Sequence, residues 1–338
     1  MMKTMNARDI VVVAASLGGL QALRTILSSL PADFPASIFI VMHIGAWPSQ
    51  LPEILQADCP LPVLHALDGQ PIAKATIYVA PPDRHMLMRD GVIVLSSGPK
   101  ENFARPAADP LFRCAAVEYG PRVIGVVLTG KLDDGAAGLK AVDACGGFTI
   151  VQEPSSCAAP DMPKAALQAV SPNRVVPIES MAAAIISGLT DDSHRGFSMD
   201  GRERIVLETK IALTGNSSPS DLERLGHRSS MTCPDCGGVV WRIGNDLPLR
   251  FRCHTGHAFS ALSLESEQRN GAENALWSAV RHLQESLLLV EELVSLAESE
   301  RRSEVKELRV RKDRLQATIE ATRQLALESS TSTAEKLA

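Results

Sequence analysis

The chain has 338 residues, of which 45% are hydrophobic and 22% are charged, and its formal net charge is -5. A single hydrophobic core rarely grows past about 250 residues, so this length predicts more than one folded part. A protein that binds nucleic acid through charge alone needs an excess of basic residues, and this chain has a small acidic excess. We therefore expect no nucleic-acid partner. The first apolar run, residues 10–15, is too short for a signal peptide or a membrane span, so we expect a cytoplasmic protein without membrane insertion.

Residues 1–188 are expected to form one α/β domain, because short apolar runs alternate with amphipathic stretches in the manner of βαβ units. Strands are predicted at 9–15, 37–43, 62–66, 76–79, 92–95, 123–128, 148–151 and 175–177. Helices are predicted at 19–30, 109–119, 135–144, 162–169 and 180–189, with Asp109 and Ser180 as N-caps. An Asp-Gly turn within 86–94 indicates a hairpin at an antiparallel margin. The expected fold is a doubly wound, mostly parallel sheet with helices on both faces.

Three further parts are predicted after this domain. Residues 189–231 are polar, with one apolar interruption near 205–213, and we interpret them as a linker that is partly ordered at most. Residues 232–262 form a compact segment rich in Cys and His. Residues 263–338 have a helical pattern and are expected to end in a disordered stretch.

The helical tail carries an apolar seam with alternating spacings of four and three, typical of a coiled coil. Its members are Leu276, Val280, Leu283, Leu287, Val290, Val294 and Ala297, and a weaker run follows at Leu308, Leu315 and Ile319. The charged stretch 298–304 between the two runs fits either the bend of a helical hairpin or one continuous rod. The seam predicts a packing surface, within the chain or in a homodimer.

The sharpest local pattern is the apolar strand that ends in Ser16-Leu17-Gly18-Gly19, followed by a helix. Small residues allow a tight turn that exposes the hydroxyl beyond the carboxyl edge of the sheet, where α/β folds build their sites. The start of the helix also directs free N–H groups toward a developing oxyanion. An N-cap serine with glycines for packing fits the same pattern. A dinucleotide or phosphate loop fits less well, because neither the G-x-G-x-x-G spacing nor a P-loop lysine is present.

His43 is the candidate base for this serine, because it ends the next predicted strand and emerges at the same edge of a parallel sheet. His65 lies within a predicted strand and His85 follows a Pro-Pro-Asp-Arg turn, so both are weaker candidates. Taken by itself, a histidine at a strand end is more often a hydrogen-bonded structural residue.

A carboxylate that orients the imidazole is offered by Asp133-Asp134, where the strand 123–128 gives way to a glycine-rich turn and a helix. In isolation both aspartates also fit simple helix caps.

These segments together resemble the catalytic domain of chemotaxis protein-glutamate methylesterases, the CheB type, over residues 9 to about 188. The resemblance is carried by residues 13–19, 41–43, 103–112 and 128–138, with further matches at 78–85 and 159–165. It implies that Ser16 is the nucleophile, His43 the general base and acid, and Asp134 the orienting carboxylate.

The resemblance also implies an enzyme that hydrolyses glutamate methyl esters on methylated chemoreceptors or receptor-like proteins. Ser16 would attack the ester carbonyl and release methanol, and a water activated by His43 would cleave the acyl-enzyme. Backbone N–H groups near Leu17 and Lys131 are the expected oxyanion donors. Arg105 is expected either to face the site and attract acidic receptor segments or to be a solvated loop arginine. No cofactor is expected for catalysis.

The chain departs from the family pattern in three respects. Leu17 stands where the family usually has threonine, and Lys131-Leu132 stands where it has Met-Gly. The third departure is the family's N-terminal receiver domain, which we do not expect here because only about eight residues precede the first strand. Regulation through such a domain is therefore not expected, and substrate preference is less secure than the triad.

The Cys/His segment predicts a structural zinc site. Cys233-Pro-Asp-Cys236 forms one half and Cys253-x-x-x-His257 the other, with strand-like arms at 239–242 and 249–252 between them. We favour these four residues as Zn²⁺ ligands over a set in which His254 replaces His257. A closed shell of three thiolates and one imidazole leaves no position for catalysis, and a segment this short needs a metal to fold.

Two functions follow from these patterns. The first is a stand-alone receptor-type methylesterase with a zinc ribbon and a coiled-coil tail. The alternative is a non-catalytic binding protein that keeps the hydrolase fold as a scaffold and recruits partners through the ribbon and the tail.

Overall fold

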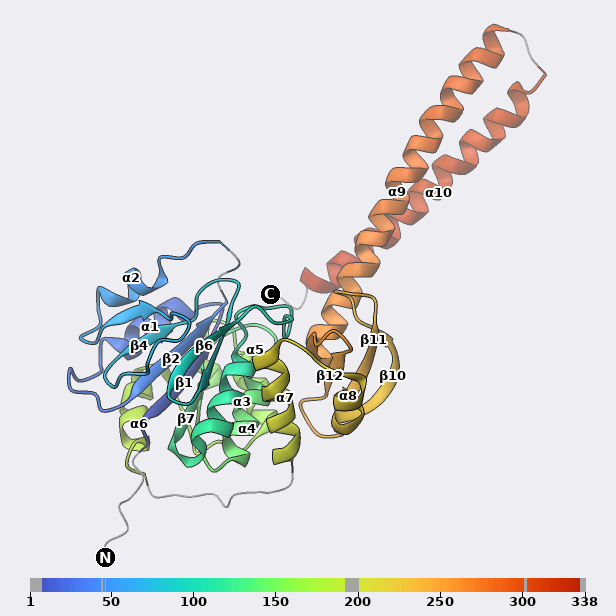
Figure 1. The fold of residues 1–338 in the computed structure, drawn as a ribbon. Coiled ribbons are helices and arrows are strands. Elements are labelled where there is room, and N and C mark those ends of the chain that lie inside the picture. The colour runs from blue at the N-terminus through green and yellow to red at the C-terminus, as the bar shows by residue number, and fades with distance from the viewer. Residues whose placement is uncertain (1–7, 44, 46, 192–200, 301–302, 335–338) are drawn as a thin grey trace, which may run out of the picture. The chain divides into compact units, whose positions relative to one another are not determined.

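The structure of the protein is a computed structural model that describes residues 8–43, 45, 47–191, 201–300 and 303–334. Two compact units are present, Met1–Leu264 and Glu265–Ala338 (Figure 1). The second unit therefore begins two residues after the predicted start of the tail. The parts predicted as 1–188, 189–231 and 232–262 form a single unit instead of three separate ones.

A seven-stranded sheet occupies the centre of the first unit, in the order β3-β4-β2-β1-β7-β8-β9. All its pairings are parallel. The strands are β1 (Ile10–Ala15), β2 (Ser37–Met42), β3 (Val63–His65), β4 (Ile77–Val79), β7 (Val123–Val127), β8 (Phe148–Gln152) and β9 (Arg174–Val176). Each lies within one or two residues of a predicted strand, because continuous apolar runs suit strands that are covered on both faces.

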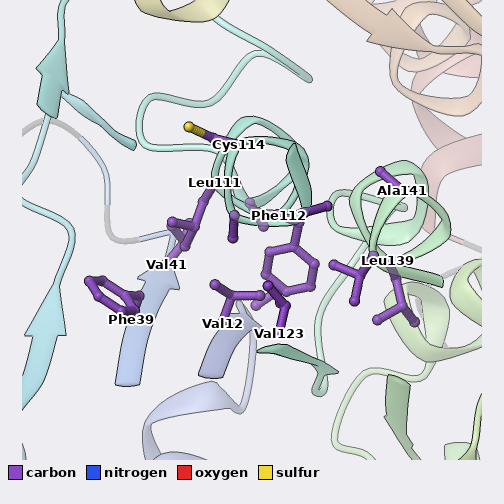
Figure 2. Close-up of a cluster of buried hydrophobic side chains, with 14 of the residues drawn as sticks. Val12, Phe39, Val41, Leu111, Phe112, Cys114, Val123, Leu139 and Ala141 are labelled. Atoms are coloured by element: carbon purple, nitrogen blue, oxygen red, sulfur yellow. The ribbon is translucent and has the colours of Figure 1, made fainter. Parts of the chain in front are cut away.

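Helices cover both faces of this sheet, which confirms the doubly wound α/β fold. One face packs against α3 (Ala108–Tyr119), α4 (Ala136–Ala144) and α5 (Asp161–Ala169), and Figure 2 shows Leu111, Phe112 and Leu139 in that core. The other face packs against α1 (Gly19–Leu27), α2 (Leu51–Gln56) and α6 (Met181–Gly188). Helix α2 was not predicted from the sequence.

Two details of the prediction are corrected. The hairpin of β5 (His85–Arg89) and β6 (Val92–Ser96) is a separate two-stranded sheet, because Met86, Leu87, Met88 and Ile93 pack into the α3 side of the core. Ser180 stands at the N-cap of α6 as expected, but Ala107 is the N-cap of α3. Asp109 lies inside α3 and accepts N–H groups from Gly135 and Gly138, so it caps α4 instead.

The predicted linker is largely folded. It contains α7 (Arg202–Thr214), α8 (Pro219–Leu225) and β10 (Gly226–Thr232), while residues 192–200 lie outside the described part. Its apolar side chains have partners beyond it: Leu207, Ile211, Leu222 and Leu225 pack with Trp241 and Ile243. Ala212 of α7 joins the α3 core, so this segment ties the Cys/His region to the sheet domain.

Residues 226–264 contain the four predicted metal ligands and are called the metal-binding module below; the module is built on a four-stranded antiparallel sheet in the order β10-β11-β12-β13. Strands β11 (Val239–Ile243) and β12 (Arg250–Cys253) are the two predicted arms, and β13 (Ala258–Ser260) follows them. A small core of its own includes Val240, Phe251 and Phe259.

A buried ion network joins the module to the sheet domain. Glu101 accepts hydrogen bonds from Arg113 of α3 and, at 2.8 Å, from Arg252 of β12. Glu208 of α7 pairs with Arg250 at 2.7 Å and with Arg252 at 3.3 Å. Burial alone would raise the pKa of both carboxyls, but the neighbouring guanidinium groups outweigh it, and the pKa of Glu208 falls to about 2.

The second unit is an antiparallel helical hairpin and not one continuous rod. Helix α9 (Ala261–Ser299) ends in the charged stretch, and α10 (Val305–Ala334) packs back along α9 (Figure 1). Ion pairs Glu298–Arg309 at 2.6 Å and Glu291–Lys312 at 2.9 Å join the two helices. Members of both predicted apolar runs are buried, namely Val280, Val290, Ala297 and Ile319, and so is Ala326, which was not predicted.

Residues 301–302 of the charged stretch and 335–338 of the expected disordered end lie outside the described residues, as do residues 1–7. Among the helices that the structure describes, none has an apolar stretch long enough to cross a membrane.

Candidate active site

The candidate site lies where the direction of strand succession reverses. Strand β1 is flanked by β2 on one side and β7 on the other, and the carboxyl ends of all three meet at one edge. Ser16 follows β1, His43 follows β2, and Asp134 lies in the turn after β7. In open α/β sheets the crevice at such a switch point is the usual ligand site. The topology thus brings together three side chains that are up to 118 positions apart in the sequence.

Close packing holds the turn at Ser16. The Ser16 N–H donates to the Thr129 carbonyl at 3.0 Å, and Gly18 has a positive φ of 78°. A Cβ at Gly18 would lie 2.5 Å from the Ala158 Cβ. A Cβ at Gly130 would lie 2.8 Å from the Ser16 Cβ and 2.0 Å from a methionine sulfur. Only glycine fits at either position, so the sequence keeps the backbone close on both sides of the serine.

His43 and Asp134 form a hydrogen-bonded pair. The His43 Nε2 lies 2.8 Å from Asp134 Oδ2, and the two side chains are 23% and 4% exposed. Burial acts to lower the pKa of His43, but the hydrogen bond and the charge of Asp134 outweigh it and raise that pKa above its ordinary value. Because Nε2 is taken by the carboxylate, Nδ1 is the ring nitrogen that can exchange a proton with a substrate or a serine.

Asp134 is held by several donors. Its Oδ2 also accepts the Ala108 N–H at 2.6 Å, and its Oδ1 accepts the Asp109 N–H and the Asn102 amide at 3.2 Å each. Burial alone would raise the pKa of Asp134, but the hydrogen bond and charge of His43 and these N–H groups lower it. The carboxylate therefore stays ionised and fixed in orientation.

Asp109 is a second buried carboxyl beside Asp134. Burial and the charge of Asp134 raise the pKa of Asp109 to about 7. Its Oδ2 accepts a second hydrogen bond from the Asn102 NH₂ group, at 3.2 Å. The sequence analysis singled out Asp109 only as a helix cap and did not identify Asn102, since a loop asparagine carries no signal of its contacts.

An open groove of about 530 Å³ borders the serine and the histidine. Its lining consists of Ser16, Leu17, Gly18, Leu20, Gln21, Met42 and His43. Leu17 is 52% exposed, so the residue that departs from the family pattern forms part of the groove wall. The groove is open enough to admit a side chain from another protein.

The other histidines and Arg105 have partners elsewhere. His65 contacts the Ser49 carbonyl at 3.0 Å, and His85 contacts the Pro99 carbonyl at the same distance. The Arg105 guanidinium is bound by Asp83 at 2.7 Å and by two backbone carbonyls. These partners fit the expected loop arginine better than an arginine that faces the site, and both roles stay predictions.

The four predicted metal ligands come together at one end of the module. The ligand atoms of Cys233, Cys236, Cys253 and His257 lie within 4.8 Å of one another. His257 Nδ1 is 3.7 Å from the Cys233 sulfur and 3.5 Å from the Cys253 sulfur. The imidazole of His254 instead packs against Gly238, outside this group.

The geometry of this cluster suits a tetrahedral metal. With metal–sulfur bonds of about 2.3 Å, tetrahedral ligands are about 3.8 Å apart, close to the 3.7 Å between the Cys236 and Cys253 sulfurs. The other ring nitrogen of His257 lies 3.9 Å from an Asp235 carboxylate oxygen, an outer partner typical of metal-bound histidines. All seven cysteines of the chain are free, consistent with thiols and a metal site in place of disulfides.

Comparison with known proteins matches the sheet domain. The family described as CheB methylesterase matches residues 11–185. A Leptospira interrogans protein, named for protein-glutamate methylesterase and protein-glutamine glutaminase activities, is 38% identical over 180 residues, which are 53% of this chain and 93% of that protein. An Anaeromyxobacter dehalogenans protein-glutamate methylesterase/protein-glutamine glutaminase is 38% identical over 178 residues, 52% of each chain.

A solved structure gives the same result. The catalytic domain of the Thermotoga maritima CheB methylesterase superposes with a TM-score of 0.51 at 32% sequence identity, and the match covers 53% of this chain and 97% of that one. None of these matches includes the whole of the chain, so the metal-binding module and the helical hairpin are read from the structure alone.

Proposed function

Because the chain belongs to the CheB methylesterase family, we propose that it hydrolyses methyl esters of glutamate side chains on chemoreceptors or receptor-like proteins, with Ser16, His43 and Asp134 as its catalytic triad. The observation that carries this proposal is the 2.8 Å pair of His43 and Asp134 at the same groove as Ser16. Each of the three follows a neighbouring parallel strand.

The proposed reaction is a two-step acyl transfer. His43 takes the Ser16 proton at Nδ1, the serine oxygen attacks the ester carbonyl, and the protonated imidazole gives its proton to the departing methanol. A water activated by His43 then cleaves the acyl-enzyme and releases the glutamate carboxylate. Asp134 stabilises the imidazolium through its bond to Nε2, so the raised pKa of His43 matches its role as proton carrier.

Backbone N–H groups of Leu17 and Lys131 are the proposed oxyanion donors. Both follow carboxyl ends of central strands, next to Ser16 in the case of Leu17 and next to Gly130 in the case of Lys131. Within the described residues, neither N–H donates a hydrogen bond to another group of the chain. Preorganised donors of this kind contribute about 100- to 1000-fold to acyl transfer.

Methanol release from methylated receptor tests the proposal. Ser16→Ala should abolish the release and the labelling by a serine-directed phosphonate, whereas the control Ser29→Ala, exposed in the turn after α1, should behave as the wild type. Ammonia release from receptor glutamines should be measured in parallel, since the relatives are named for both activities. Wild-type protein that neither releases a product nor reacts with the phosphonate would favour the scaffold alternative.

We also propose that the Cys₃His cluster binds one structural Zn²⁺ per chain. Three thiolates and an imidazole are a donor set typical of structural zinc sites, and Cys233 and Cys253 lie in the small apolar core of the module. Metal analysis of protein purified without chelator should give one equivalent of zinc. Cys253→Ser should lower it well below one, while the isolated thiol variant Cys59→Ser should not.

For the helical hairpin we propose a role in partner binding or in a homodimer. Its seam is used between α9 and α10, yet Leu288, Leu289, Leu293 and Leu296 remain 48–63% exposed on α9. Sedimentation equilibrium of the full chain tests this assignment. If the chain is a monomer at all concentrations, the homodimer is refuted, and the exposed leucines would then bind another protein.

A further inference from the structure

The Asn102 side chain lies between the triad carboxylate and the metal-binding module. Its Nδ2 donates to Asp134 Oδ1 and to Asp109 Oδ2, at 3.2 Å each. Its Oδ1 accepts the Ser260 N–H at 2.8 Å and the Ser263 hydroxyl at 3.0 Å. An amide has two N–H donors and two acceptor lone pairs, so all four are used.

These contacts fix the amide in one orientation. The Ser260 N–H can only donate, so the group that faces it is the oxygen, and the NH₂ group is turned toward the carboxylates. A polar network with every member satisfied is rigid, whereas an unpaired member in a buried site is costly. Asn102 is therefore held from the module side and acts on Asp134 from the opposite side to His43.

The backbone of the Asn102 loop depends on the module as well. Asn102 and Phe103 have positive φ values of 51° and 60°, a region that non-glycine residues rarely occupy. The Asn102 N–H donates to the Ala258 carbonyl at 2.8 Å, and the Ala258 N–H donates to the Lys100 carbonyl at 3.2 Å. Phe103 packs on Phe259 of β13, with ring centroids 4.8 Å apart.

The module also reaches the turn of the triad directly. The Ser260 hydroxyl donates to Asp133 Oδ1 at 2.6 Å and accepts the Ser263 N–H at 3.0 Å, so it caps α9 while it binds the residue before Asp134. Strand β13 follows the metal ligand His257 immediately. The fold of the metal-binding module thus places Ser260 and Ser263 against the catalytic turn.

We propose that Asn102 is a positioning residue for Asp134, and that the docked metal-binding module holds it in place through Ser260 and Ser263. This inference rests on the proposed esterase function, because Asp134 orients His43 in that reaction. It makes the module a structural component of the catalytic site, although it contributes no residue to the groove beside Ser16. The charged groups that face His43 in this arrangement are Asp134 and Asp109.

The experiment compares Asn102→Leu, which keeps the size but removes the amide, and Ser263→Ala, which removes one of the two bonds that hold it. Ser229→Ala is the matched control, because the Ser229 hydroxyl is part-buried in the same module but donates to the Val240 carbonyl. Phosphonate titration gives the fraction of competent sites, and kcat, KM and the pH dependence of kcat/KM are measured per titrated site.

Asn102→Leu should lower kcat per titrated site by at least about tenfold with little change in KM, as expected for a lost hydrogen bond to a charged group. The acid limb of its kcat/KM profile should move to lower pH, because a less constrained Asp134 supports the imidazolium less. Ser263→Ala should change both in the same direction by a smaller factor, and Ser229→Ala should change neither.

A purely structural role predicts fewer titratable sites with wild-type kcat and an unmoved acid limb, and that result overturns the inference. Failure of the proposed function is a different outcome, seen as wild-type protein without Ser16-dependent turnover. In that case NMR titration of the His43 ring in the full chain tests the positioning role of Asn102. The pKa of His43 should fall in Asn102→Leu, and an unchanged pKa would refute that role.

Discussion

Glu101→Gln should strongly destabilise the first unit, because it removes the negative charge between two buried guanidinium groups. Glu101 is 3% exposed, and the side chains of Arg113 and Arg252 are 2% and 1% exposed. Loss of one partner from a buried pair costs about 3–5 kcal/mol, since the remaining charges stay buried without compensation. For a unit of this size that corresponds to a fall in Tm of about 6–20 °C.

Urea unfolding of the full chain, followed by tryptophan fluorescence, measures this loss, because Trp241 is the buried one of the three tryptophans and lies in the module. The control is Asp58→Asn, which breaks the exposed Arg24–Asp58 pair of 2.6 Å and should cost at most about 1 kcal/mol. Pairing Glu101→Gln with Arg252→Met should recover part of the stability, because it removes one of the two buried guanidinium charges that lose Glu101, while Arg113 remains.

The dependence on pH gives a second check. The guanidinium groups of Arg113 and Arg252 hold the pKa of Glu101 well below its usual range in spite of burial. A depressed carboxyl pKa contributes stability above the pKa of the unfolded chain, about 4.3, and that contribution is lost as the pH falls through the folded pKa. The difference between wild type and Glu101→Gln should be constant near neutral pH and should narrow below about pH 4. A difference no larger than that of Asp58→Asn at pH 7 would refute the reasoning.

Three other predictions concern the groove and the hairpin. Asp134 raises the pKa of His43 against the effect of burial, so the acid limb of the kcat/KM profile should lie above pH 6.5. An Asp134→Asn variant should move that limb to lower pH. Gly130→Ala should reduce esterase activity at least about tenfold, because its Cβ would lie 2.8 Å from the Ser16 Cβ, and overpacking of this kind costs about 1–3 kcal/mol. In the hairpin, Val290→Asp should lower helicity and Tm, while the matched control Val310→Asp, at an exposed position of α10, should leave both unchanged.

Each has a clear contrary result. If the acid limb of the Asp134→Asn variant lies at the same pH as in the wild type, Asp134 does not set the pKa of His43. An active Gly130→Ala enzyme would show that the turn can relax. Equal losses in both hairpin variants, by circular dichroism, would mean that the packing face is assigned incorrectly.

Much of the sheet domain could be predicted because its signals are local. Buried parallel strands are continuous apolar runs, and the residues that end three of them, Ser16, His43 and Asp134, emerge at one edge by topology alone. The Cys/His spacing likewise predicted the hairpin arms of the module. The comparisons support the family, but the catalytic roles stay predictions until the variants are measured.

Other features could not be predicted because they depend on distant partners. The segment with α7 was interpreted as a linker since it is rich in charged residues, but Glu208 is buried there and paired with Arg250, 42 positions away. Asn102 meets Ser260 across 158 positions. Sequence patterns predict that charged and amide side chains are exposed to solvent, so they do not predict buried pairs between distant residues.

The way in which α7 bridges the first unit determines where the polypeptide can be shortened. Ending the chain near residue 190, a choice that the family match alone would suggest, removes Ala212 from the α3 core and takes away the carbonyl to which Ser96 donates at 2.9 Å. The same truncation removes Arg252, the buried partner of Glu101. A truncated protein intended for crystallisation or assay should therefore end after Leu264, between the two compact units, and a fragment that ends before Arg202 should be expressed only with surface substitutions that replace what α7 covers.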